Sequence, residues 1–179
     1  MKSKALNNLQ IIKIHDNYET PTKKFKEYCK IAKVKPKLDA SGSKRLHKTP
    51  RYFTKDSLKK EWKVDFWLNP PYSKVAEFIK HAYEQHKKHN VNGICLVYSK
   101  TDTSWFHDYV WHKAELYFIR GRIKFWKDGK IVKWCKKCKK NFVHKKKKCK
   151  ICKTTLTINS APYPSMLIIY RKKKRKKKG

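Results

Sequence analysis

The hydrophobic residues of the chain follow two spacings, one helical and one typical of short buried strands. Helical spacing first occurs over Lys23–Lys33, directly after Thr20-Pro21, which combines a capping residue with a proline suited to a first turn. It returns over Val75–Tyr83, where Ser73 is the expected helix cap. A third stretch, Thr103–Trp111, is short and rich in aromatic residues. The pattern therefore predicts three helices.

Between these helices, apolar runs of strand length predict the strands of a sheet. One strand ends at Leu38, before the small-residue turn Asp39–Ser43. A hairpin is expected to pair Arg122–Trp126 with Lys130–Trp134 across a turn at Asp128-Gly129. Strands that alternate with helices indicate an α/β fold, whose ligands bind at the carboxyl ends of the strands. Buried strands are predicted at Val64–Leu68, Gly93–Tyr98 and Ser165–Tyr170, and a further strand is predicted at Glu115–Ile119.

The apolar runs are too short for a membrane protein. None exceeds about five residues, whereas a membrane-spanning helix needs roughly 20. The N-terminal region also lacks the apolar core of a signal peptide. We therefore expect a soluble protein without a membrane partner, in the cytoplasm of a bacterial, archaeal or phage-infected cell. In a eukaryotic host the basic run Arg171–Lys178 would suit a nuclear-localisation signal.

The charge is strongly unbalanced, with 48 Lys and Arg residues against 13 Asp and Glu residues and a net charge of +35. A field of this size favours a polyanionic partner, usually nucleic acid. The alternative is that the lysine surplus reflects a genome rich in A and T. Residues 129–179 hold 20 basic residues and no acidic one. Residues 171–179 are predicted to form a disordered basic tail whose Arg171 and Arg175 contact phosphates, or else a solvated tail without a task.

Four of the six cysteines form a Cys-x2-Cys-x10-Cys-x2-Cys pattern. Each Cys-x2-Cys knuckle presents two thiolates to one metal ion, and two knuckles close a tetrahedral zinc site with no open position. The alternatives are two disulfides, which would be unusual without a secretory signal, or four unrelated thiols. The pattern predicts structural Zn²⁺ in an inserted ribbon over residues 130–156. Its ligands would be Cys135, Cys138, Cys149 and Cys152.

The candidate reaction centre is Asn69-Pro70-Pro71-Tyr72, at the end of a predicted strand. The two prolines stiffen the turn and remove two backbone donors, so that carbonyl oxygens are available to a ligand. The Asn69 side-chain oxygen and the Pro70 carbonyl can both accept from one planar amino group, which exposes its nitrogen lone pair for methyl transfer. Tyr72 offers a face on which a base that has left the duplex stacks. The alternative is a rigid turn that caps a strand.

Together with other segments, this motif resembles the phage-type DNA N-6-adenine methyltransferase family, which is Dam-like. The similarity covers most of residues 15–126 and resumes at about 160–170. Asn-Pro-Pro-Tyr occurs in other methyltransferases as well, but its combination with Thr-Asp-Thr-x-Trp-Phe and Gly-Arg-x-x-Phe is much more specific. The matching segments are Tyr18–Pro21, Leu38–Ala40, Asp65–Ser73, Ser99–His107, Ala114–Phe125 and Ala161–Ser165.

The resemblance implies a Rossmann-like fold that uses S-adenosylmethionine (SAM) to methylate the N6 amino group of adenine in double-stranded DNA. By this analogy Thr20-Pro21 lies near the methionine end of SAM, and Asp39 contacts its amine directly or through water. Ser41–Ser43 forms the turn that approaches the cofactor, and Asp56 binds its adenine or ribose. The implied cofactor-binding residues are Thr20, Pro21, Asp39, Ala40, Ser41, Asp56 and Asn69, and the implied catalytic residues are Asn69, Pro70, Pro71 and Tyr72.

Five further residues are candidates for DNA contact. Thr101, Asp102 and Trp105 follow a predicted strand and face the same edge of the sheet, where they would shape the target-base pocket. Their alternative roles are a helix cap and a core residue. Arg120 and Arg122 are candidates for phosphate or base contacts, with solvated surface charge as the alternative.

The chain departs from the family pattern in its cofactor turn, its length and its insertion. The turn after Asp39 holds a single glycine, and only 30 residues lead from Asp39 to Asn69, so we expect a trimmed sheet. The cysteine insertion is expected to recognise the target or to clamp DNA. The predicted domains are a methyltransferase domain over residues 1–129 and 157–170, the zinc ribbon over residues 130–156 and the tail over residues 171–179.

Three other functions remain open from the sequence. A glutamine side-chain amide is also a planar amino group, and an RNA base would suit the same basic, aromatic surface. A zinc-ribbon DNA-binding protein that retains an inactive methyltransferase core belongs to a different class. A binding protein would tolerate Asn69→Ala, whereas an enzyme would lose turnover and still bind DNA.

Overall fold

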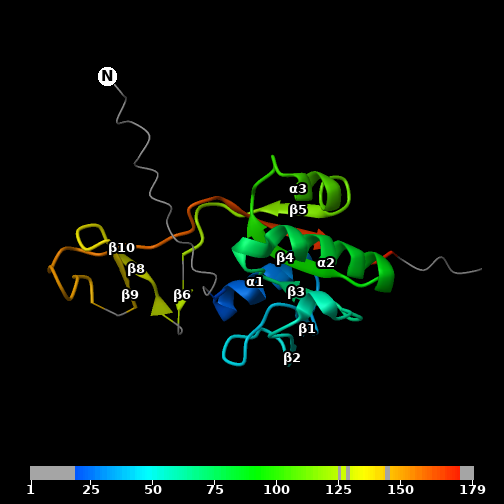
Figure 1. Cartoon of the computed structure of the whole chain (residues 1–179), viewed down its shortest axis with the longest axis horizontal. Coiled ribbons are helices and arrows are strands. Elements are labelled where there is room, and N and C mark those ends of the chain that lie inside the picture. Colours follow the sequence, from blue (N-terminus) through cyan, green and yellow to red (C-terminus); the bar gives the residue numbers. More distant parts are fainter. Residues whose placement is uncertain (1–18, 125, 128–129, 144–145, 174–179) are drawn as a thin grey trace, which may run out of the picture.

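The computed structural model describes residues 19–124, 126–127, 130–143 and 146–173 (Figure 1). Its helices are α1 (Thr22–Ala32), α2 (Val75–His89) and α3 (Ser104–Tyr109), with short 3₁₀ turns η2 (Ser57–Lys59) and η3 (Tyr72–Lys74). The main sheet contains β1 (Leu38–Asp39), β2 (Arg51–Tyr52), β3 (Phe66–Leu68), β4 (Gly93–Tyr98), β5 (Glu115–Phe118) and β11 (Ser165–Tyr170). The remaining strands are β6 (Trp126–Lys127), β7 (Lys130–Ile131), β8 (Lys133–Cys135), β9 (Lys140–Phe142) and β10 (Thr157–Ile158).

The six-stranded sheet is mixed, with the order β2-β1-β3-β4-β11-β5. The strands β1, β2, β3 and β4 pair in parallel, whereas β11 runs antiparallel to both β4 and β5. The predicted α/β class is therefore confirmed as a mixed α/β sheet. On the β1 side of the sheet, the described residues form one further strand, the two-residue β2. This short edge agrees with the expectation of a trimmed sheet.

Helices cover both faces of the sheet. Successive side chains of β4 point alternately to the two faces and enter two different core clusters. Cys95 and Val97 point into the core cluster under α2 and α3, whereas Ile94 and Leu96 point into the cluster under α1. Every residue of β4 and of β11 is buried. Strands buried on both faces read as continuous apolar runs, which is why their predicted bounds match the structure.

Two local predictions near α2 and in the hairpin differ from the structure. Ser73 lies inside η3 and the residue that precedes α2 is Lys74, because the Lys74 backbone N–H donates to Pro71 O at 3.0 Å and forms a tight turn first. The hairpin pairs only β6 with β7, and Trp134 instead joins β8 in a separate three-stranded sheet. The predicted turn at residues 128–129 lies outside the described residues.

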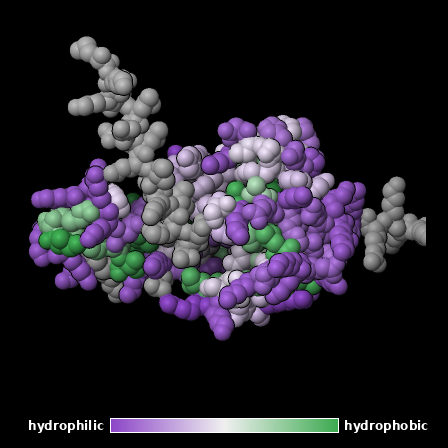
Figure 2. Space-filling view, in the orientation of Figure 1, coloured by the Kyte–Doolittle hydropathy of each residue, from purple (hydrophilic) through white to green (hydrophobic). Residues whose placement is uncertain are grey.

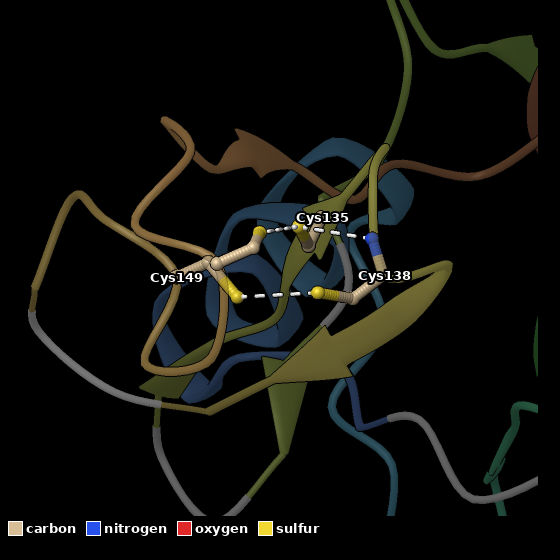
Figure 3. A group of neighbouring side chains, drawn as sticks. Cys135, Cys138 and Cys149 are labelled. Atoms are coloured by element: carbon tan, nitrogen blue, oxygen red, sulfur yellow. Dashed lines mark hydrogen bonds between the residues drawn. The ribbon is translucent and has the colours of Figure 1, made fainter.

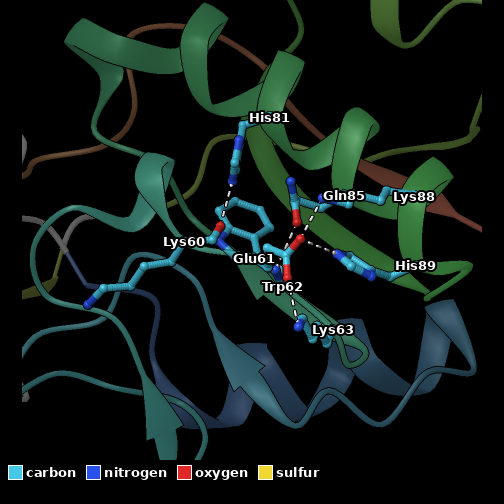
Figure 4. Close-up of polar contacts among 8 residues, drawn as sticks. All are labelled: Lys60, Glu61, Trp62, Lys63, His81, Gln85, Lys88 and His89. Carbon is cyan, nitrogen blue, oxygen red and sulfur yellow. Dashed lines mark hydrogen bonds and ion pairs between the residues drawn. The ribbon is translucent and has the colours of Figure 1, made fainter.

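The segment before β3 is attached to α2 by polar contacts (Figure 4). The Trp62 backbone N–H donates to Gln85 Oε1 at 2.9 Å, and His81 Nε2 lies 3.0 Å from Lys60 O. Glu61 forms ion pairs with Lys88 at 2.5 Å and with Lys63 at 2.7 Å, and these two ammonium groups lower the pKa of its carboxyl to about 2. These contacts fix the segment that carries η2, which borders the site described below.

The first residues of the predicted tail are ordered parts of the fold. Arg171 donates through Nη1 to Ala32 O and through Nη2 to Glu115 Oε2, the latter at 2.6 Å. The backbone N–H of Lys172 donates to Asn92 Oδ1 and that of Lys173 to Asn90 Oδ1. The predicted disordered tail therefore does not begin at residue 171, because side chains at both ends of the α2–β4 connection hold these residues. Residues 174–179, including Arg175, lie outside the described residues.

The surface in Figure 2 is mostly hydrophilic, with apolar patches in the region of β8, β9 and β10 and between the helices. Within the described residues, no helix combines the length and the apolar character needed to cross a bilayer. The large apolar side chains that remain exposed are Trp111, Tyr117, Phe118, Ile151, Ile158 and Tyr163.

Candidate functional site

The order of the parallel strands reverses between β1 and β3. After β1 the chain adds β2 on one side, and it then returns to add β3 and β4 on the other. In open α/β sheets the carboxyl ends of strands at such a reversal leave a crevice in which ligands bind. Asp39 ends β1 and Leu68 ends β3, so the segments that follow these two strands form the candidate site.

Three predicted site residues from distant parts of the sequence meet at this reversal. The Ser41 hydroxyl donates to Asn69 O at 2.8 Å and accepts from the Asn69 backbone N–H at 3.2 Å. The Asn69 side-chain nitrogen donates to Thr20 Oγ1 at 3.4 Å, and Thr20 is buried. Because its nitrogen faces Thr20, the side-chain oxygen of Asn69 is directed elsewhere as an acceptor. Ala40, between the two strand ends, donates its backbone N–H to Trp67 O at 2.9 Å.

Asp39 is a buried carboxylate that shapes the turn after β1. Its oxygens accept from the backbone N–H of Ser41 at 3.2 Å and of Lys48 at 2.8 Å. Burial raises the pKa of the Asp39 carboxyl, and the two backbone hydrogen bonds oppose that rise. A side chain at Gly42 would be crowded, because its Cβ would lie 3.0 Å from the Tyr52 Cβ and 3.3 Å from the Asp39 Cγ. A cation bound beside this carboxylate would relieve its desolvation.

The raised pKa of Asp39 predicts a pH-dependent difference between the wild type and Asp39→Asn. Above the ordinary value of 3.8 the unfolded chain loses its proton more readily than the folded one. The free energy of unfolding of the wild type therefore falls as the pH rises from 3.8 through the raised folded pKa. Asp39→Asn has no such titration. One lost hydrogen bond should lower its free energy of unfolding by an amount that does not depend on pH. Relative to the wild type, its free energy of unfolding should then rise as the pH increases across this interval. Urea unfolding at a series of pH values measures the difference, and a pH-independent difference would contradict the prediction.

The Asn69–Tyr72 motif leaves β3 as a tight turn. Pro70 is buried and Pro71 half-buried, and Pro71 O accepts the backbone bond that begins η3. The ring of Tyr72 stacks on that of Tyr98 with centroids 4.1 Å apart and an angle of 4° between the planes. Tyr98 is the last residue of β4, so the stack connects the motif to the end of the neighbouring strand. Sequence reasoning missed Tyr98, although an aromatic residue at the end of a strand next to the motif was an available signal.

Asp56 borders a hollow beside the same motif. It has a left-handed backbone conformation, with φ 52°, and directly precedes η2. The Ser57 hydroxyl donates to Ala40 O at 2.5 Å, which attaches η2 to the end of β1. The hollow has a volume of about 470 Å³ and is lined by Asp56, Ser57, Leu58, Lys59, Pro71, Ser73, Lys74 and Phe78. The predicted cofactor residue Asp56 thus shares a hollow with the predicted catalytic motif.

Some of the predicted DNA contacts are exposed and others are not. Thr101 and Asp102 are exposed in the turn after β4, but Trp105 is buried in the main core. Its indole packs among apolar side chains and is not displayed at the surface, because the helical spacing of α3 turns it inward. Arg120 is exposed, and Arg122 donates from Nη1 to Pro162 O at 2.6 Å. Arg171 follows Tyr170, which pairs with Gly93, the first residue of β4. Arg171 is therefore near the amino ends of the parallel strands, whereas Asn69 is at their carboxyl ends.

The four cysteines of the insertion lie together, with all four sulfurs within 4.8 Å of one another (Figure 3). The sulfurs of Cys135 and Cys152 are 3.4 Å apart and those of Cys138 and Cys149 are 3.8 Å apart. A disulfide would require about 2.05 Å, whereas two sulfurs of a tetrahedral zinc site lie about 3.8 Å apart. The sulfurs are therefore too far apart for two disulfides, and they lie close enough together to hold one metal ion.

Hydrogen bonds to the sulfurs support thiolates at this cluster. The backbone N–H of Cys138 donates to the Cys135 sulfur, and that of Ile151 donates to the Cys149 sulfur, both at 3.4 Å. Hydrogen bonds with Thr154 lower the pKa of Cys152 to about 6, whereas the neighbouring sulfurs, Cys152 first, raise the pKa of Cys138 to about 12. Four adjacent thiols do not all ionise alone, and a divalent cation among them favours the ionised form of each. The donor set therefore fits a metal ion.

The cysteine module packs against the candidate site. Val132, which precedes β8, and Ala161, which precedes β11, form a buried cluster with Tyr98, and Tyr72 packs against that cluster. Backbone hydrogen bonds from Ala161 N to Ile123 O at 2.7 Å and from Glu19 N to Trp126 O at 3.1 Å fix the segments that flank the module. Figure 1 shows the module to one side of the main sheet. The insertion thus contacts the Tyr72–Tyr98 stack through Val132.

Comparisons with known proteins agree with these features. A family model described as DNA N-6-adenine-methyltransferase (Dam) matches residues 9–179. A DNA N-6-adenine-methyltransferase of Escherichia phage T1 is 33% identical over 86 residues, which are 46% of this chain and 36% of the relative. A protein of the same description from Haemophilus phage HP1 is 28% identical over 114 residues, which are 62% of this chain and 66% of the relative. The chain thus spans less than two thirds of the length of either relative. No solved structure matches it.

Proposed function

The chain belongs to the DNA N-6-adenine-methyltransferase (Dam) family, and from this premise we propose that it transfers a methyl group from SAM to the N6 amino group of adenine in double-stranded DNA. The observation that carries the proposal is the meeting of Thr20, Ser41 and Asn69 at the reversal of the strand order. That position is where an α/β sheet binds its ligand, and Asn69 begins the motif suited to a planar amino group.

The proposed chemistry needs two acceptors and a stacking surface. The side-chain oxygen of Asn69 and the carbonyl of Pro70 accept hydrogen bonds from the adenine amino group and hold it in place. These bonds draw the nitrogen toward tetrahedral geometry, so that its lone pair points to the methyl donor. The target base, once out of the duplex, stacks on Tyr72, which Tyr98 supports from behind at 4.1 Å. The motif needs no strong base, because the proton leaves after the nitrogen has attacked.

The proposed cofactor would occupy the crevice beyond β1 and β3. Bound SAM supplies an electrophilic methyl group on a sulfonium. The buried carboxylate of Asp39 favours the cationic methionine end, beside Thr20-Pro21 and the Ser41–Ser43 turn. Asp56 is proposed to accept from a ribose hydroxyl or from the adenine amino group, across the hollow that it shares with Pro71. The strand order and the single antiparallel strand β11 support a Rossmann-like methyltransferase fold for this sheet.

We propose that the four-cysteine cluster binds one structural Zn²⁺. The donor set of four thiolates with no open position is that of structural zinc. The module then forms a unit of its own, over about residues 130–156, inserted into a methyltransferase domain of residues 1–129 and 157–170. Since the relatives are phage proteins, we propose that the reaction takes place in the cytoplasm of a phage-infected cell.

The test is methyl transfer from labelled SAM into duplex DNA of varied sequence, with RNA and a mixed protein extract as parallel substrates. Nucleoside analysis of the DNA should show N6-methyladenine. Label only in RNA or on protein glutamine would change the substrate, and no label from folded protein that binds DNA would favour a non-catalytic binding protein. Either result would refute the proposed function.

Truncation after Lys173 should weaken DNA binding without changing which adenines are methylated. It removes five basic residues and retains Arg171, which holds Glu115 and Ala32. Each phosphate that the shortened chain no longer neutralises should lower the salt slope of the binding constant by about 0.9. Phosphate contacts carry no sequence information, so the methylated sites should stay the same. Binding across a salt series and sequencing of methylated DNA provide the measurements, with a Gly/Ser tail of equal length as the control. A changed site preference would contradict the prediction.

A further inference from the structure

The segment Ala161–Ser165 has no task in the proposed reaction, yet it reaches the same edge of the sheet. Because β11 runs antiparallel to β4, its first residue, Ser165, pairs with Tyr98 at the end of β4. The Ser99 backbone N–H donates to Pro164 O at 2.9 Å. The residues that precede β11 therefore lie beside the Tyr72–Tyr98 stack, where a target base would arrive.

Tyr163 extends this stack toward solvent. Its ring centroid lies 5.5 Å from that of Tyr98, with 57° between the planes, and Tyr98 in turn stacks on Tyr72. Tyr98 is 5% exposed, whereas Tyr163 is 45% exposed. The three tyrosines form a row that starts at the proposed catalytic motif and ends in a ring accessible from outside.

The backbone around Tyr163 is held in place. Prolines on both sides restrict it, the Arg122 guanidinium donates to Pro162 O at 2.6 Å, and Ala161 N donates to Ile123 O at 2.7 Å. An exposed aromatic side chain on a fixed backbone loses little conformational entropy when it binds a planar partner. This arrangement suits a contact surface better than it suits core packing.

A cation accompanies the exposed ring. The ammonium of Lys100, on an exposed side chain, lies 4.9 Å from the Tyr163 ring centroid. Aromatic rings that stack on bases, next to cations that contact the backbone, are the usual elements of single-stranded nucleic-acid binding. A long lysine side chain can leave the ring for a phosphate when a base takes its place.

We propose that Tyr163 and Lys100 form a second stacking site for DNA, beside the catalytic tyrosine. A base that neighbours the target adenine stacks on Tyr163, and Lys100 contacts the adjoining phosphate. The site stabilises the opened duplex while the target base occupies the position at Tyr72. The inference rests on the proposed function for the identity of the polymer.

Binding of fluorescein-labelled duplex DNA with one adenine opposite an abasic site tests this inference. Tyr163→Ala should weaken binding by about 10-fold, the order expected when one base–aromatic stack is removed. Tyr163→Phe, which retains the ring, should stay within about 2-fold of the wild type. Tyr163→Leu, which still covers Tyr98 but cannot stack, should behave like Tyr163→Ala and remain informative if the alanine variant is poorly folded. Lys100→Gln should lower the salt slope by about 1.

The matched control is Tyr117→Ala, since Tyr117 is a tyrosine of similar exposure, 42%, in the middle of β5. Its binding should equal that of the wild type. Wild-type binding by folded Tyr163→Leu, or an equal loss in Tyr163→Phe, would overturn the stacking site. Methyl transfer is measured in parallel: Tyr163-dependent binding by a wild type that does not methylate DNA would refute the proposed reaction and support the stacking site. Methylation with Tyr163-independent binding would refute the stacking site alone.

Discussion

An Asn69→Ala variant is expected to lose methyl transfer to adenine by about 10²- to 10⁴-fold, the range for removal of one positioned catalytic group. The substitution removes the side-chain oxygen that we propose as an acceptor for the adenine amino group, and it leaves the Pro70 carbonyl as the single proposed acceptor. The Asn69 backbone contacts with Ser41, at 2.8 Å and 3.2 Å, do not involve the side chain and should persist. Binding of DNA should therefore stay close to that of the wild type, while single-turnover methylation falls.

The comparison variants separate chemistry from structure. Asn159→Ala removes the same side chain next to the cysteine module, where Asn159 donates to Asn141, and should methylate at the wild-type rate. Thr20→Val removes the acceptor that orients the Asn69 amide and should give a smaller loss than Asn69→Ala. Methylation by Asn69→Ala at the wild-type rate would refute the assigned role of Asn69, whatever its effect on stability.

Cys135→Ser is expected to remove the metal and to unfold the cysteine module. Cys135 is fully buried in a cluster with Cys149 and Leu156, and structural zinc contributes about 10–16 kcal/mol to small zinc domains. Zinc content should fall from one ion per chain to a small fraction of that, and limited proteolysis should cut between residues 130 and 160. Because Val132 and Ala161 pack on Tyr98, methyl transfer should fall as well.

The control for this experiment is Cys29→Ser, the same substitution at a half-buried cysteine of α1 outside the cluster. Zinc content and protease resistance should be those of the wild type. Treatment of the wild type with a chelator should reproduce the proteolysis pattern of Cys135→Ser, and added Zn²⁺ should reverse it. Full zinc content in Cys135→Ser would contradict the four-cysteine site.

Some elements were predictable because their signal is local and strong. Strands β4 and β11 are continuous apolar runs, since both of their faces are buried, and they match their predicted bounds. The cysteine knuckles are recognisable from spacing alone, because two ligands three residues apart meet one metal. The strands β1 and β2 have two residues each, which is too short to show an alternation of apolar and polar positions. They are recognised by their pairing, β1 with β3 and β2 with β1.

Other residues had two interpretations in the sequence, because a residue type allows several environments. Trp105 suited a base pocket as well as a core, and the direction of α3 places it in the core. Arg171 suited a phosphate-binding tail, but the end of β11 places it between Ala32 and Glu115, where it also lowers the pKa of the Glu115 carboxyl. In each case the deciding partner is distant along the chain.

The family, the α/β class, the four-cysteine motif and the Asn69–Tyr72 motif could be identified from the amino-acid sequence, because they depend on residue types at short spacing. The folded chain was needed to show that Thr20 and Ser41 meet Asn69, that Tyr98 stacks on Tyr72 and that Tyr163 lies at the same edge of the sheet. Those contacts follow from the reversal of strand order and from the antiparallel direction of β11. Strand order and direction are chosen by the packing of apolar faces across the whole sheet, and no local pattern along the chain encodes them.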